Sequence, residues 1–190
     1  MAIHVPNPFE TESHAAIATH LAQPAARAVL RGVELNTLRS SRAYPVHFAS
    51  LDDLEIGQMP EIPGRWRHLL VSEGRIVGEV DVDQKGSRVV ALHRGPRANA
   101  MAQAMERVHS LTSMQERDYE LRLLESPSIY LIALWLHATN DDDLVMAMDP
   151  DQSGLPRNEA ITLKEALPTL QKRAAFVREA QENNPGPSGA

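Results

Sequence analysis

The chain has 190 residues, a formal net charge of -6 and no cysteine. This length suits one domain with a sizeable core, and a negative charge without a long basic run disfavours nucleic acid or an anionic membrane as a partner. Without cysteine there is no disulfide framework, thiolate metal site or cysteine nucleophile, which fits a reducing compartment and predicts a cytoplasmic location. The longest apolar run, 129–136, is far below the roughly 20 residues of a membrane-spanning helix.

Two short helices are predicted before residue 39. Ser13 is a plausible N-cap for the first helix, and Pro24 separates the two, because proline fits the first turn of a helix and breaks its interior. We interpret residues 1–43 as a helical N-terminal arm and 44–182 as one α+β globular domain. Residues 183–190 have no apolar anchor and are expected to form a disordered tail.

Residues 65–93 predict a three-stranded antiparallel meander, because apolar residues alternate with polar ones between two strong turn signals. The first turn is Glu73-Gly74, a pair suited to a two-residue hairpin since glycine tolerates positive φ. This turn places Ser72 opposite Arg75. The pairing of the remaining residues of the meander follows from that contact.

The register of the meander predicts a polar face. Continued without a bulge, it places His68 opposite Glu79, and a three-residue loop at 84–86 then brings His93 diagonal to Glu79 on the same side. Two imidazoles and a carboxylate suit a divalent transition metal or proton transfer. The interpretation we prefer is an ordinary cross-strand polar pair of His68 and Glu79. A slip of one residue in either turn would move one histidine to the opposite face.

A second candidate site lies where the meander ends and a helix begins. Arg94 and Arg97 flank the helix start, and with Asn99 and the free amides of the first turn they predict a seat for a phosphate or carboxylate. The segment has one glycine, Gly95, whereas a Walker loop or a dinucleotide fingerprint needs several. An ordinary solvated turn is the favoured interpretation of this segment, and the anion site is the alternative.

Further elements are predicted outside the meander: strands at 44–49, 119–124 and 144–148, helices at 99–114 and 128–137, and a last helix that starts at 162. The segment 128–137 is apolar nearly all round and is expected to be the buried centre of the fold. Thr162 and Glu165 have the spacing of a capping box for the last helix. Pro168 is expected to kink that helix or to restart it.

These elements predict a single-domain α+β fold, with a mainly antiparallel sheet covered by helices. No motif identifies a cofactor. The leading functional prediction is a soluble accessory or regulatory domain without catalytic activity that binds another protein, and a homo-oligomer is left open. The alternative is an enzyme or ligand-binding protein that uses His68, Glu79 and His93 with Arg94 and Arg97 to hold a metal or an anion.

Overall fold

The computed structural model describes residues 3–5, 9–112, 118–139, 142–149 and 151–183. Within them nine strands form one sheet and five helices pack against it, so the predicted α+β class is confirmed. The helices are α1 (Glu10–Leu21), α2 (Pro24–Val29), α3 (Leu51–Ile56), α4 (Pro96–Thr112) and α5 (Leu163–Asn183). The strands are β1 (Ile3–His4), β2 (Arg39–Phe48), β3 (Arg65–Ser72), β4 (Arg75–Asp83), β5 (Val89–His93), β6 (Tyr119–Ser126), β7 (Leu131–His137), β8 (Leu144–Ala147) and β9 (Ala160–Thr162).

The strand order is β5-β4-β3-β2-β6-β7-β8-β9, and neighbours are antiparallel except for the parallel pair β2 and β6. The parallel pairing is short, because β2 meets β6 only over Val46–Phe48. The small strand β1 pairs with the same edge of β6 at Tyr119 and Glu120. Within the described residues, Leu121 and Arg122 of β6 therefore have no strand partner on that edge.

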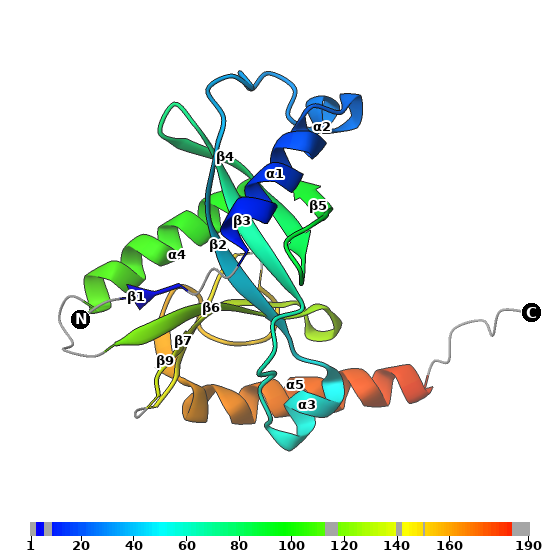
Figure 1. Ribbon diagram of the computed structural model, residues 1–190. Coiled ribbons are helices and arrows are strands. Elements are labelled where there is room, and N and C mark those ends of the chain that lie inside the picture. Colours follow the sequence, from blue (N-terminus) through cyan, green and yellow to red (C-terminus); the bar gives the residue numbers. More distant parts are fainter. Residues whose placement is uncertain (1–2, 6–8, 113–117, 140–141, 150, 184–190) are drawn as a thin grey trace, which may run out of the picture.

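Helices cover both faces of the sheet (Figure 1). Helix α4 crosses one face, where Met101, Ala104 and Val108 pack in a core cluster with residues of β2, β6, β7 and β8. On the other face, α1 and α2 cover β3 and β4, while α3 and α5 cover β6, β7 and β8. Among the described residues, no helix is both long and apolar enough to cross a bilayer.

The N-terminal helices are packed onto the sheet. Ile17 and Leu30 are 2% and 1% exposed and belong to a core cluster with Leu70 and Val80. Pro24 begins α2 as predicted, but Ser13 lies inside α1 and is not its N-cap. The N-cap of α1 is Phe9, whose side chain makes no capping hydrogen bond, so no capping signal marks the start of this helix.

The C-terminal half differs from its prediction in one element. The segment 128–137 is a single 3-10 turn, η1 (Pro127–Ile129), followed by the central strand β7. The predicted helix was wrong because a strand buried on both faces is as continuously apolar as a buried helix. The capping box of Thr162 and Glu165 is confirmed, because the Thr162 N–H donates to the Glu165 carboxylate at 2.9 Å and the Glu165 N–H donates to the Thr162 hydroxyl at 3.2 Å.

Two predicted segments extend beyond the described residues. The helix predicted at 99–114 corresponds to α4, which begins earlier, at Pro96, and residues 113–114 lie outside the described part. Of the predicted tail at 183–190, only Asn183 is described, as the last residue of α5.

The turn at Glu73-Gly74 is confirmed, with φ of 50° and 75° and with Ser72 opposite Arg75. A β-bulge follows at once, because Val71 pairs with Ile76 while the next residue, Leu70, pairs with Gly78. Val77, between Ile76 and Gly78, has no partner on β3. Each later residue of β4 is thereby shifted by one position against β3.

The bulge overturns the predicted polar face. His68 lies opposite Val80, whereas Glu79 lies opposite Leu69, so His68 and Glu79 face opposite sides of the sheet. The loop at 84–86 does have Gly86 at a φ of 70°, but a second register shift follows it, and His93 pairs directly with Glu79. The prediction that the three residues share one face was therefore wrong for His68.

Candidate functional site

Six charged side chains meet on the face of the sheet that α4 covers. They are Arg65 and Arg67 of β3, Glu79 and Asp81 of β4, Arg97 of α4, and Glu125 of β6. We call this set the charge network. Its two β4 residues are on the same side as the β3 arginines because the bulge has shifted the register.

Arg67 is the centre of the charge network and is 1% exposed. Its Nε and Nη2 donate to the two carboxylate oxygens of Asp81 at 2.7 and 2.9 Å, and its Nη1 donates to Glu125 at 2.6 Å. Burial alone would lower the pKa of Arg67, but the bond to Asp81 and the charges of three carboxylates outweigh burial and raise it. Arg67 is therefore a fixed positive charge inside the protein.

Arg65 and Arg97 complete the charge network from its more exposed side. The Arg65 guanidinium lies 2.8 Å from Asp81 and 2.7 Å from Glu125. Arg97 Nε lies 3.0 Å from Glu79 Oε1, and its Nη2 contacts Glu125. Three arginines thus balance three carboxylates, as buried charges require.

Glu79 is the least satisfied member of the charge network. Its side chain is 1% exposed, and neither carboxylate oxygen has a hydrogen-bond partner of good geometry within the described residues, although Arg97 is close. Burial raises the pKa of Glu79, while Arg67 and Arg97 act in the opposite direction. A buried carboxyl group with a perturbed pKa in the wall of a cavity is a typical feature of functional sites.

Two cavities flank Arg97. The first, which we call the α4 cavity, has about 190 Å³ and is lined by Glu79, His93, Arg94, Gly95, Pro96, Arg97 and Ala98. The second has about 270 Å³ and is lined by Arg97, Glu125, Pro127, Tyr130, Leu131, Ile132 and Gln152. Because the charge network contributes to both walls, a ligand in either cavity would contact Arg97.

The structure brings four of the six predicted site residues together. Glu79, His93, Arg94 and Arg97 all line the α4 cavity, whereas Asn99 is exposed on α4 outside the lining. Arg94 also donates from Nη1 to the carbonyl of Arg31.

His68 is separated from this group by the sheet. It is fully buried, its Nδ1 lies 2.8 Å from the Ser41 carbonyl, and its ring lies 5.5 Å from that of His14. Burial lowers the pKa of His68. Across the part of the chain that the structure describes, no three histidine or acidic side chains are grouped so that they could hold a metal ion.

Four members of the charge network were not identified from the sequence, namely Arg65, Arg67, Asp81 and Glu125. Arg65 and Arg67, like Glu79 and Asp81, are two residues apart in otherwise apolar strands. That spacing places both charges of each pair on one face of a strand, so an ionic pairing across β3 and β4 could have been predicted. No local pattern, in contrast, points to Glu125, which is 58 residues from Arg67.

The chain matches no family model, no curated protein and no solved structure. The class of the protein is therefore defined by its fold and site alone. It is a single α+β domain with a charge network beneath the N-terminus of α4 and a cavity on each side of Arg97.

Proposed function

We propose that this chain is a ligand-binding domain that takes a small oxyanion, a phosphate or a carboxylate, in the α4 cavity. The observation that carries the proposal is the composition of the cavity wall. It combines the first turn of a helix of 17 residues with two arginines, a histidine and one buried, poorly satisfied carboxyl group.

The helix start supplies neutral donors. Pro96 occupies the first helical position, where a backbone N–H would have no partner within the helix, and the following Arg97 and Ala98 carry N–H groups that also precede the first intrahelical bond. Such groups, together with the helix dipole, favour an anion at this end. Arg94 adds a charged donor, since its bond to Arg31 uses only part of its guanidinium.

Glu79 gives the cavity a means of sensing its ligand. As a carboxylate it competes with an incoming anion for Arg97, and as a carboxylic acid it leaves Arg97 free and offers a proton to a ligand oxygen. The raised pKa of Glu79, which burial causes, makes the acid form easier to reach. Oxyanion binding is thus expected to be coupled to proton uptake by Glu79.

Calorimetric titration with inorganic phosphate and with acetate tests this function. Arg94→Gln should weaken binding about tenfold or more, as loss of a charged hydrogen bond does, while Glu79→Gln should strengthen it because the competing charge is gone. Arg27→Gln, at an exposed position on α2, is the matched control and should bind like the wild type. Absence of binding up to about 10 mM, or equal affinity in the Arg94→Gln and Arg27→Gln variants, would refute the proposal.

The accessory protein-binding function and the cytoplasmic location expected from the sequence remain proposals beside this one. One observation favours a protein partner. Tyr130 is 60% exposed at the rim of the second cavity, in a left-handed conformation with a φ of 56°. Exposed tyrosines beside pockets are frequent anchors in protein interfaces, and strained residues concentrate at binding sites.

A further inference from the structure

A third cavity lies where the sheet divides. Strands β2 and β6 pair over Val46–Phe48 and then separate, and β1 rejoins the edge of β6 only at Tyr119 and Glu120. The space between them has about 330 Å³, near the lower end of the range of small-molecule pockets. We call it the fork cavity.

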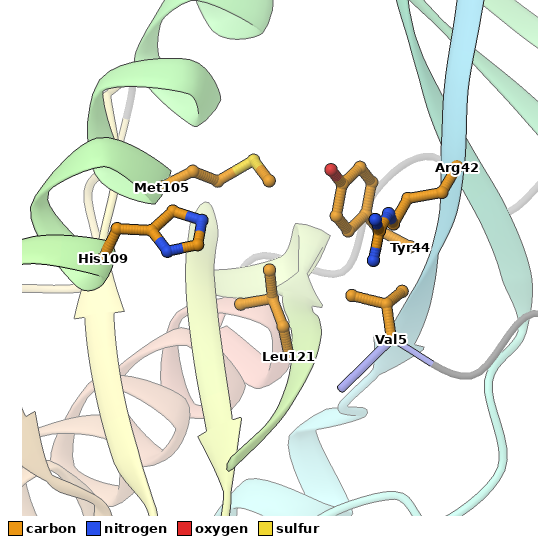
Figure 2. A pocket seen from close by; sticks show the side chains of 6 residues that line it. All are labelled: Val5, Arg42, Tyr44, Met105, His109 and Leu121. Carbon is orange, nitrogen blue, oxygen red and sulfur yellow. The ribbon is translucent and has the colours of Figure 1, made fainter. Parts of the chain in front are cut away.

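Side chains from three elements, together with Val5, converge on the fork cavity (Figure 2). Met105 and His109 extend from α4 on one side, and Arg42 and Tyr44 extend from β2 on the other. Leu121 of β6 and Val5, next to β1, complete the lining. The fork cavity is near the middle and end of α4, whereas the α4 cavity is at its first turn, so the two are separate sites.

Two polar side chains of the fork cavity, Arg42 and Tyr44, lack partners in the described part of the chain. Tyr44 is 6% exposed, yet its hydroxyl makes no hydrogen bond there, and its side chain points into the cavity. Burial raises the pKa of Tyr44, so the hydroxyl keeps its proton and can donate it. The exposed Arg42 guanidinium likewise has no ion-pair partner among the described residues.

Three of the four further residues of the lining are apolar, and His109 is the fourth. Leu121 is 3% exposed, and Val5 and Met105 are partly buried against the same core cluster. Methionine adapts to ligands of different shape, because its side chain is unbranched and flexible. A ligand that satisfies both parts of the lining needs an anionic head and an apolar body.

We propose that the fork cavity binds an organic acid with an apolar chain, with its carboxylate or phosphate head at Arg42 and Tyr44 and its chain against Leu121, Val5 and Met105. This site is additional to the α4 cavity, which lies at the first turn of the same helix and is the smaller of the two. The Tyr44 hydroxyl faces the cavity without a partner among the described residues, so it can donate to a ligand oxygen.

Binding of octanoate, octyl phosphate, octylamine and acetate, measured by calorimetry, tests the proposal. Octanoate or octyl phosphate should bind, and the tighter of the two identifies the preferred head group. Octylamine should fail because its charge repels Arg42, and acetate should bind the fork cavity poorly because it lacks the chain. Arg42→Gln should weaken octanoate binding about tenfold, and Tyr44→Phe about two- to tenfold, as expected for one charged and one neutral hydrogen bond.

Two matched variants separate this site from other surfaces. Arg27→Gln controls for the loss of an exposed arginine and should bind octanoate like the wild type. Arg94→Gln weakens the α4 cavity, so the octanoate binding that remains in this variant, and that is lost when Arg42→Gln is added, belongs to the fork cavity. Arg42 is exposed and Tyr44→Phe retains the buried ring, so both test variants should fold. The proposal is overturned if octylamine binds as well as octanoate, if Arg42→Gln binds like Arg27→Gln, or if no octyl compound binds.

Discussion

His47 is the side chain whose protonation should make this protein sensitive to acid. It is 1% exposed on β2, where its Nδ1–H donates to the Pro60 carbonyl at 2.9 Å and its ring meets the edge of Trp135. Burial, with a smaller contribution from the charge of Arg122, lowers the pKa of His47 to about 4. The neutral imidazole is therefore the form that fits the folded protein.

The direction of the pH effect on stability follows from which state of the chain, folded or unfolded, binds the proton of His47. Between a pKa of 6.5 in the unfolded chain and about 4 in the folded protein, the unfolded chain binds a proton that the folded protein does not. The contribution of neutral His47 to the free energy of unfolding is therefore complete above the pKa of the unfolded chain. It is lost as the pH falls toward the pKa of His47 in the folded protein. Since one pKa unit corresponds to 1.36 kcal/mol, His47 should account for a loss of about 3 kcal/mol.

Urea unfolding at about pH 7 and about pH 4 measures this loss, with His47→Asn as the variant, because Asn can donate to Pro60 but does not titrate. Between the two pH values, the free energy of unfolding of the wild type should fall by about 3 kcal/mol more than that of the variant. His20→Asn, at the end of α1, serves as the control and should retain the full pH dependence. If the wild type and His47→Asn lose the same free energy of unfolding, the argument from burial is refuted.

Two further changes test other parts of the structure. Arg67→Leu should cost about 3 to 5 kcal/mol in urea unfolding, because it leaves Asp81 and Glu125 buried without their central partner; a cost near that of the exposed Arg27→Leu would show that the charge network contributes little. Tyr130→Gly should raise the melting temperature, because glycine relieves a left-handed strain of about 1 kcal/mol; an unchanged or lower melting temperature would show that the ring contacts offset the strain.

The meander shows how far local sequence reasoning reaches. The Glu73-Gly74 turn was located because its chemistry is local, but the adjacent bulge was missed. A Cβ at Gly78 would lie 2.6 Å from the carbonyl oxygen of His93, so this glycine permits a close approach of β5. A glycine inside a strand is a known signal of a bulge or of close approach, and it could have warned against a regular register.

Other features depend on contacts that the sequence does not contain. The run 129–136 has the same apolar pattern whether it forms a buried helix or a central strand, and only its neighbours β6 and β8 decide between the two. The α4 cavity was partly predicted because Arg94 and Arg97 are adjacent in sequence to the helix start. The charge network was not, because Arg97 meets Glu79 and Glu125 only after the sheet has assembled.

The short parallel contact between β2 and β6 has a consequence for how this chain folds. On one side of it, β2 to β5 are joined by sequence-local antiparallel pairs, and on the other side β6 to β9 are joined in the same way. Val46, however, must find Leu123, a contact that closes a much longer loop and is correspondingly slow. Each half-sheet should therefore form early, their junction should form last, and the amides along this seam should be the first to exchange with solvent when the native protein opens.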